Sequence, residues 1–199
     1  VQAVGSALTI LEGESLQERG ILTLESALHL VPGTGIGSEG RQRGSISALR
    51  MRGTESDHTL MRIDGVRVSD SNISPLNLIG GDSLFGYSSI NVLRGPQSAL
   101  YGSEAIGGVV DLNTRVGSGD PRRQLLLEAG SFGSFRGGIE LEGESDDLRW
   151  FIGGSREETE NDRASNDFQQ DLFAMRLERD LGAETVSYTH LTLPTTLQV

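Results

Sequence analysis

Short apolar stretches separated by glycine-rich connections fill residues 1–120, and this pattern predicts a small α+β domain. The Asp64-Gly65 pair stands between β-prone residues and predicts a two-residue hairpin turn, because both residues tolerate positive φ angles. The polar, glycine-rich residues 33–45 are expected to form an exposed loop, and residues 69–88 a loop with small helical turns. Strands are predicted over residues 7–11, 46–52, 89–93 and 108–114.

Three short helices are predicted within the same domain. In the first, Ser15 is the expected N-cap, Glu18 reaches back as in a capping box, and Gly20 follows the last turn. The second begins after Thr23 with the sequence LESALHL. The third lies between the last two predicted strands, with Pro96 near its first position.

After Pro121 apolar and charged residues alternate, which predicts antiparallel strands with one apolar face and one charged face. We expect four strands of about nine to eleven residues, joined by GSFGS, by ESDD and by the long polar segment GSREETENDRASND. The same alternation fits the wall of a membrane β-barrel and half of a soluble antiparallel sandwich, so periodicity leaves both open. The residues expected on the apolar face include Ile139, Leu141, Leu148, Trp150, Ile152, Phe173, Met175, Leu177 and Leu181.

Composition narrows the classes of function. The formal net charge is −11, and all 17 basic residues are arginine, which argues against non-specific nucleic-acid binding. Cysteine is absent, so neither a disulfide framework nor a thiolate metal site is expected. No run of roughly 18 apolar residues predicts a spanning helix, and no basic segment leads into an apolar one as in a signal peptide. The 27 glycines favour turns and close backbone packing.

Candidate catalytic and ligand motifs are weak. GTGIG at 33–37 lacks the G-x-G-x-x-G spacing of a dinucleotide loop, and a Walker loop needs a lysine, which the chain lacks. GGDSL resembles the nucleophile block of GDSL hydrolases, but Ser83 has no base at the expected spacing, since Ser187 stands three residues before His190. His29 and His58 have no second histidine at zinc-ligand spacing. We therefore expect no enzyme activity, no cofactor and no metal site.

Two longer segments carry a family resemblance. RMRGTESDHTLMRIDGVRVSD (50–70) and INVLRGPQSALYGSEAIGGVVDLNTR (90–115), in that order, resemble the plug domain of TonB-dependent outer-membrane receptors. GSALTILEGESLQERGILTLESALHLVPG (5–33) is similar to the start of that plug. The resemblance implies a plug over 1–120, lodged in a barrel of 22 strands whose first strands, about four, occupy 121–185.

The resemblance also implies roles for individual residues. Arg52 and Arg94 match two family arginines that pair with glutamates on the inner barrel wall, further downstream than this chain extends; the alternative is that both cap local turns. Gly102, Gly107 and Gly108 are expected where the backbone approaches itself or the wall closely. The remaining residues of the plug motif are Gly53, Asp64, Gly65, Gly95, Pro96 and Tyr101.

As implied by the resemblance, the function is energy-coupled uptake of a scarce ligand, such as a ferric siderophore or cobalamin, across the outer membrane of a Gram-negative bacterium. The plug gates the lumen, and the TonB-ExbB-ExbD complex pulls on a TonB box that this sequence lacks. Plug loops 34–45 and 69–82 are expected at the outer face, with Phe173, Met175 and Leu177 toward lipid and Trp150 near an interface band. The residues expected to contact ligand are Arg41, Arg43, Asn72 and Asn77.

The final segment departs from the family pattern. Residues 186–199 (VSYTHLTLPTTLQV) carry no charge and no evident barrel alternation, so we expect them to be foreign to the family and disordered or poorly packed. A soluble ligand-binding or β-sandwich module is the alternative for the whole chain, and a hydrolase acting through Ser83 is a remote one.

Overall fold

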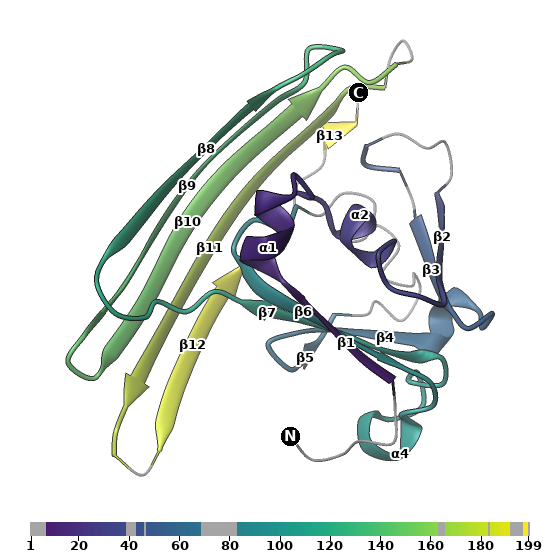
Figure 1. The fold of residues 1–199 in the computed structure, drawn as a ribbon, viewed down its shortest axis with the longest axis horizontal. Coiled ribbons are helices and arrows are strands. Elements are labelled where there is room, and N and C mark those ends of the chain that lie inside the picture. Colours follow the sequence, from purple (N-terminus) through teal and green to yellow (C-terminus); the bar gives the residue numbers. More distant parts are fainter. Residues whose placement is uncertain are drawn as a thin grey trace. The chain divides into compact units, whose positions relative to one another are not determined.

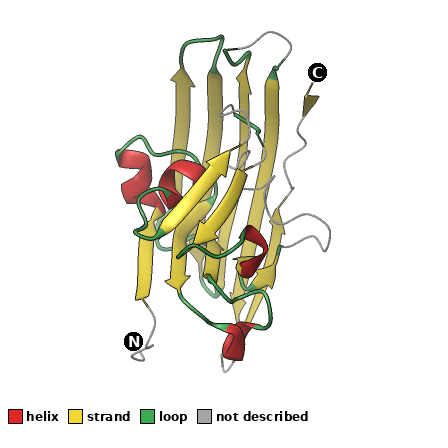
Figure 2. Cartoon of the chain, turned by 90° about the vertical axis from the view of Figure 1, so that its right-hand side faces the viewer, coloured by secondary structure: helices red, strands yellow, loops and turns green. Residues whose placement is uncertain are grey.

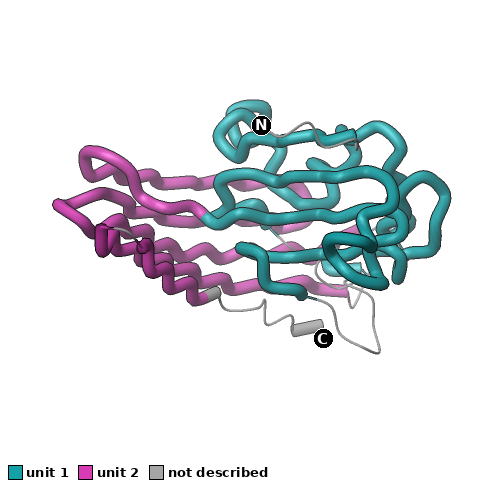
Figure 3. The backbone as a smooth tube through the Cα atoms, turned by 90° about the horizontal axis from the view of Figure 1, so that it is seen from below, with its two compact units in different colours: residues 1–114 teal, residues 115–199 magenta. Residues whose placement is uncertain are grey.

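The computed structural model describes residues 7–38, 43–45, 47–68, 83–162, 166–182, 184–191 and 197–198. The chain divides into two compact units, Val1–Thr114 and Arg115–Val199 (Figure 3). The connection 115–120, which the sequence assigned to the first domain, groups with the second unit.

The first unit is built on a mixed five-stranded sheet with the order β1-β6-β7-β4-β5 (Figure 1). All of its neighbours are antiparallel except β4 and β7, which run parallel. The predicted strands of this sheet are confirmed. Their bounds are β1 Ala7–Glu12, β4 Thr59–Ile63, β5 Val66–Arg67, β6 Tyr87–Arg94 and β7 Gly108–Thr114.

Two helices follow β1, as predicted, but the first starts earlier than expected. Helix α1 spans Gly13–Glu18, so Ser15 lies inside the helix and is not its N-cap. The N-cap is Glu12, which ends β1 and makes no side-chain cap, because the chain passes directly from strand to helix. Gly20 follows the helix with φ of 70°. In α2, Leu24–Leu28, the Thr23 hydroxyl caps the backbone N–H of Ser26, as a helix N-cap should.

The segment predicted as an exposed loop over 33–45 contains a strand. Strand β2, Thr34–Ser38, pairs antiparallel with β3, Ser47–Met51, from Thr34 opposite Met51 to Ser38 opposite Ser47. The sequence pattern did not predict this strand because glycine occupies every second position, so only Thr34, Ile36 and Ser38 bear side chains there. In Figure 1, α1 and α2 lie on the same side of the five-stranded sheet as β2 and β3. The short 3-10 helix η1, Ser56–His58, leads into β4, and α4, Ser98–Tyr101, lies between β6 and β7.

Apolar side chains from both sheets and α2 form the core of the first unit, where their burial stabilises the fold. Fully buried members are Leu24, Leu28, Leu49, Met51, Met61, Ile90, Val92, Val109, Val110 and Leu112.

The second unit is one antiparallel sheet with the order β12-β11-β10-β9-β8, in which β13 (Leu197–Gln198) also pairs with β11 (Figure 2). The four predicted strands are confirmed, although β8 is shorter and β10 and β11 are longer than expected. Strands β10 and β11 continue into the polar segment because their side chains still interact across the two strands. Arg156, for example, forms an ion pair with Asp171. The bounds are β8 Arg122–Ala129, β9 Phe135–Ser145, β10 Leu148–Thr159 and β11 Phe168–Asp180.

The register places the predicted apolar residues on one face of this sheet. Trp150 stands opposite Leu177, and Ile152 opposite Leu141 and Met175. Successive side chains of a strand point to opposite faces, so the charged residues between them share the other face. None of the described helices is long and apolar enough to cross a membrane.

The C-terminal segment is more regular than the sequence suggested. Strand β12, Thr185–Leu191, pairs with β11 over its whole length, so the expectation of disorder is wrong for residues 186–191. Val186, Tyr188 and His190 stand opposite Arg179, Leu177 and Met175, on the apolar face. Backbone N–H and C=O groups on a strand edge can pair with an extended segment of almost any sequence, so this strand needs no side-chain alternation.

Candidate functional site

The glycine-rich stretch after β6 closes a hairpin with β7. Beyond the last ladder pair, Arg94 opposite Gly108, the N–H of Gly95 donates to the Gly107 carbonyl at 2.8 Å. The N–H of Gln97 donates to the Ala105 carbonyl, also at 2.8 Å. The Gly107 N–H donates to the His58 carbonyl at 2.8 Å, which ties this loop to the start of β4.

Close backbone contact explains two of the three glycines singled out in the sequence. A Cβ on Gly107 would overlap the Thr54 hydroxyl oxygen and lie 3.3 Å from the His58 carbonyl oxygen. A Cβ on Gly108 would overlap the Leu93 carbonyl oxygen and the sulfur of Met51. Gly102 has a different cause, because nothing lies within 4 Å of its Cβ position and its φ is 93°. Only glycine adopts that backbone conformation without strain.

Other residues of the motif form turns and contacts in the same unit. Asp64 and Gly65 have φ of 47° and 79° and form the predicted two-residue turn between β4 and β5. The Asp64 carboxylate accepts hydrogen bonds from the N–H and hydroxyl of Thr114, at 2.9 and 2.6 Å. The guanidinium carbon of Arg62 lies over the Tyr101 ring, 4.9 Å from the ring centroid. The turn after β3 has positive φ at Gly53, and Pro96 is exposed before α4.

Arg94 ends β6 and reaches back to the N-terminal part of the unit. Its Nη1 donates to the Pro32 carbonyl at 2.7 Å, and its Nη2 to the Thr9 hydroxyl at 3.1 Å. Its Nε is buried and makes no hydrogen bond within the described residues. These contacts are of the turn-capping kind that the sequence left as the alternative for this arginine.

Arg52 lies beside this group. Its own N–H donates to the Gly33 carbonyl at 2.8 Å, and a Cβ on Gly95 would lie 2.9 Å from its Nη1. The structure therefore brings two arginines together around the Pro32-Gly33 turn. Among the described residues neither forms an ion pair with a carboxylate. Two positive charges near one turn, without a carboxylate partner among the described residues, suit an anionic partner.

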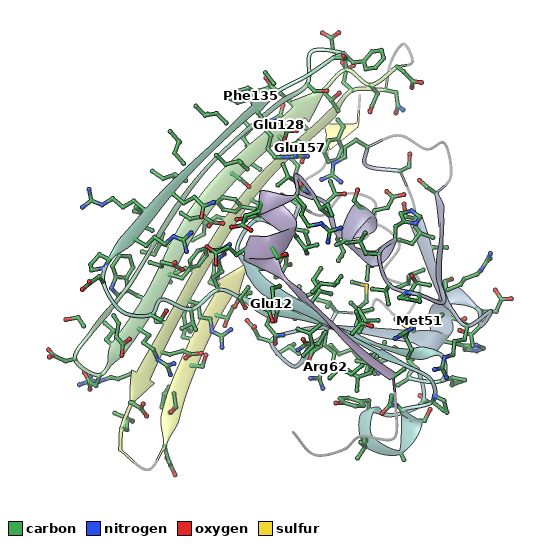
Figure 4. All side chains as sticks on the ribbon, viewed as in Figure 1. Glu12, Met51, Arg62, Glu128, Phe135 and Glu157 are labelled. Atoms are coloured by element: carbon green, nitrogen blue, oxygen red, sulfur yellow. The ribbon has the colours of Figure 1, made fainter. Side chains whose placement is uncertain are left out.

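The charged face of the second unit is paired within itself. Arg136 donates to Glu157 through Nε at 3.1 Å and Nη2 at 2.9 Å, and to Glu128 through Nη1 at 2.6 Å. Figure 4 shows Glu128 and Glu157 close together on this sheet. Glu178 pairs with Arg149 at 3.0 Å and also binds Arg176. Further pairs are Arg115 with Glu140 and Arg122 with Glu142.

A half-open pocket of 540 Å³ lies in the first unit, between α2 and β2. Arg43, one of the residues expected to contact ligand, lines it. Arg41, Asn72 and Asn77 lie outside the described residues. The pocket combines positive, negative and neutral polar groups with one aliphatic side chain. Its lining is Thr23, Glu25, Ser26, His29, Ile36, Ser38 and Arg43.

Ser83 lies in a local turn. Its side chain is buried, its backbone bridges to Thr23, and its hydroxyl oxygen accepts a hydrogen bond from the Phe85 N–H at 3.3 Å. His29 and His58 lie on separate elements, and the described residues contain no cluster of three metal-ligating side chains.

Sequence reasoning missed the ion pair that joins β4 to β7 inside the plug motif. Arg62 on β4 binds Asp111 on β7 through two hydrogen bonds, at 3.3 Å from Nε and 2.8 Å from Nη2 (Figure 4 labels Arg62). Only the register makes these two residues neighbours, because they stand opposite each other in the parallel pair. The spacing of 49 positions gives no local signal.

Comparison with known proteins agrees with this architecture. Residues 1–109 match the family described as TonB-dependent Receptor Plug Domain. The vitamin B12 transporter BtuB of Vibrio vulnificus is 34% identical over 112 residues, which are 56% of this chain and 18% of that protein. The match therefore covers less than a fifth of that relative's length.

Solved structures share the fold over nearly the whole chain. The ferric yersiniabactin uptake receptor FyuA from Yersinia pestis superposes with a TM-score of 0.77 at 20% identity, covering 94% of this chain and 31% of that one. FpvA of Pseudomonas aeruginosa superposes with a TM-score of 0.80 at 16% identity, covering 96% and 25%. At such identities the likeness shows the fold alone, an α+β plug followed by antiparallel strands of an unclosed barrel. With the family match over more than half of its length, the chain belongs to the TonB-dependent receptors, of which it carries the plug domain and the first barrel strands.

Proposed function

We propose that this chain is part of an outer-membrane active transporter of a Gram-negative bacterium, in which residues 1–114 gate the lumen of a barrel that begins with β8. The observation that carries this proposal is the sheet of the second unit, which follows a plug in the same chain. One face exposes large apolar side chains, with Leu125 68% and Leu127 66% accessible, and the other holds paired charges. Such a sheet suits lipid on one side and a polar lumen on the other.

Ion pairs on the charged face of the second unit limit which carboxylates can bind Arg52 and Arg94. Glu140, Glu157 and Glu178 already have arginine partners within the second unit. We propose that the carboxylates for Arg52 and Arg94 come from later strands of the complete barrel. Docking would then exchange the neutral acceptors of Arg94, the Pro32 carbonyl and the Thr9 hydroxyl, for a carboxylate, whose negative charge and two oxygens bind a guanidinium more strongly.

The ligand class proposed is a ferric siderophore or cobalamin, the two kinds of cargo that the relatives' names mention. We further propose that the pocket between α2 and β2 is the plug's share of the ligand site. Arg43 supplies a fixed positive charge there, and Glu25 and His29 supply further polar groups. Energy coupling would come from the TonB-ExbB-ExbD complex, acting on the chain N-terminal to the plug.

An uptake assay tests the proposal. A complete receptor that carries this chain should transport one of a panel of labelled ferric chelates or cobalamin, and a strain without TonB should accumulate none. Arg43→Ala should weaken binding of that ligand, whereas Arg50→Ala removes the same charge from an exposed position of β3 and should leave binding unchanged. Uptake that persists without TonB would contradict the coupling, and a panel without any transported member would contradict the function.

The hydrolase alternative has its own test. A serine acts as a nucleophile only with an adjacent base, and the hydrogen bond at Ser83 comes from a backbone N–H. We expect a fluorophosphonate probe to leave the chain unlabelled, as read by intact-protein mass spectrometry. Labelling that disappears in Ser83→Ala would revive this alternative.

A further inference from the structure

Residues 115–119, which connect the plug to β8, contact the sheet of the second unit at three positions, Arg115, Gly117 and Gly119. Arg115 Nη1 lies 3.6 Å from Glu140 Oε2, and the two side chains are only 8% and 6% exposed. Four residues further on, the Gly119 carbonyl accepts a hydrogen bond from the Glu144 N–H at 3.0 Å. The Gly119 N–H in turn donates to Glu144 Oε2, also at 3.0 Å.

Gly117 lies between these two attachments and is in closer contact than either. A Cβ there would overlap the carbonyl oxygens of Gly143 and Trp150 and lie 2.5 Å from the Gly143 nitrogen. Its backbone is therefore packed directly against two neighbouring strands, β9 and β10. Only a residue without a side chain fits at this position.

The position of these attachments matters because β8 is exposed to any load that passes along the chain. Within the described sheet β8 pairs with β9 alone, and its ladder begins at Arg122 opposite Glu142. A pull on the plug that reached Arg122 would load that first pair and open the ladder one pair at a time. A buried ion pair resists the same pull, because separating it leaves a buried charge without its partner.

We propose that residues 115–119 are a fixed anchor that ends force-driven remodelling of the plug at Thr114 and protects β8 from being peeled off the wall. This inference rests on the proposed function, since it assumes that force reaches the plug from its N-terminal side. Arg115 and Gly117 act as positioning residues, because they hold the connection and need not touch the ligand. In this scheme the plug rearranges up to Thr114 while the wall stays intact.

Single-molecule pulling on a complete receptor in outer-membrane vesicles tests the anchor. The sequence has no cysteine, so Gln2→Cys adds a single thiol handle to this chain. At about 3.3–3.6 Å per residue, release of the chain between the handle and Thr114 gives roughly 370–400 Å before the force rises again. With Arg115→Ala or Gly117→Ala, a further step of roughly 23–25 Å, from residues 115–121, should follow at lower force.

Matched variants separate the anchor from general damage to the sheet. Gly154→Ala places a Cβ whose nearest contact is the Leu172 carbonyl oxygen at 3.8 Å, and Arg122→Ala removes a charge that lies outside the anchor. In both control variants the extension should still stop at Thr114. Glu140→Gln serves as the second test if Gly117→Ala does not insert into the membrane, and Arg115→Lys should restore most of the stop.

Two results would overturn the inference: a wild-type receptor that extends beyond Thr114 without a rise in force, or anchor variants that match their controls. The outcome is independent of the transport assay. Uptake without a stop at Thr114 refutes the anchor and leaves the proposed function, and a stop without uptake of any chelate does the reverse.

Discussion

Replacing Gly107 by alanine tests whether close packing, and not only backbone conformation, requires glycine in the plug loop. The new Cβ would overlap the Thr54 hydroxyl oxygen, which is fixed by its hydrogen bond to the Met51 carbonyl at 2.9 Å. Either Thr54 rotates and loses that bond, or the loop moves and strains the bond from Gly107 to the His58 carbonyl.

The expected cost follows from these two outcomes. Losing one neutral hydrogen bond costs about 0.5–1.5 kcal/mol, and overpacking a close contact costs about 1–3 kcal/mol. Alanine returns about 0.4–1 kcal/mol by restricting the unfolded chain. Since only one of the two outcomes occurs and alanine offsets part of its cost, we expect Gly107→Ala to lower the free energy of opening of this sheet by about 1 kcal/mol. Thr54→Ala removes the overlapping atom, so the double variant should lose at least about 1 kcal/mol less than the sum of the single variants.

Native-state hydrogen exchange of the 199-residue chain in detergent micelles measures this free energy at the amides of Val92 and Val110, which face each other in β6 and β7. Gly35→Ala is the control, because nothing lies within 4 Å of its Cβ position, and it should change protection little. A loss below about 0.5 kcal/mol for Gly107→Ala, or a double variant equal to the sum of its parts, would refute the packing argument.

Two further predictions concern ion pairs. Asp111→Asn should lower the same free energy of opening by about 1.5–3 kcal/mol, because Arg62 loses two charged hydrogen bonds in a pair only 22% and 18% exposed. Glu55→Gln in an exposed pair should change it by less than about 1 kcal/mol, and equal effects would contradict the argument. A hydrogen bond from Arg179 lowers the pKa of Asp147 in the turn after β9, so Arg179→Gln should raise that pKa toward its ordinary value in an NMR titration. Any stability from this pair is present above the unfolded pKa and lost as the pH falls through the folded one, and an unchanged titration would contradict the assignment.

Most of the fold could be predicted from local sequence signals. The Asp64-Gly65 turn, the Thr23 cap and the two-residue alternation after Pro121 each depend on chemistry within a few residues, and the structure has all three. The prediction of Ser15 as an N-cap was wrong because the strand passes directly into the helix, so the residues of the expected capping box lie inside the helix. β2 was missed because its alternate glycines remove the apolar signal of a strand.

The site was harder to predict because its geometry depends on register and on chain crossings. Arg52 and Arg94 were named from family motifs, but their meeting around Gly95 and the Pro32-Gly33 turn needs the three-dimensional fold. Gly117 stood outside every motif. Its contact with β9 and β10 follows from the path of the connection, which no local pattern encodes.

If β8 to β11 form a wall with lipid on one face and a polar lumen on the other, side chains on the two faces differ in their access to lipid and water. Spin labels on single cysteines, introduced in a complete receptor in membranes, test it directly. Labels at Leu125, Leu127 and Ile139 should collide with dissolved oxygen far more than with a nickel chelate in water, and labels at Gln124 and Leu126 should not. Equal access of the nickel chelate to both sets would contradict the account.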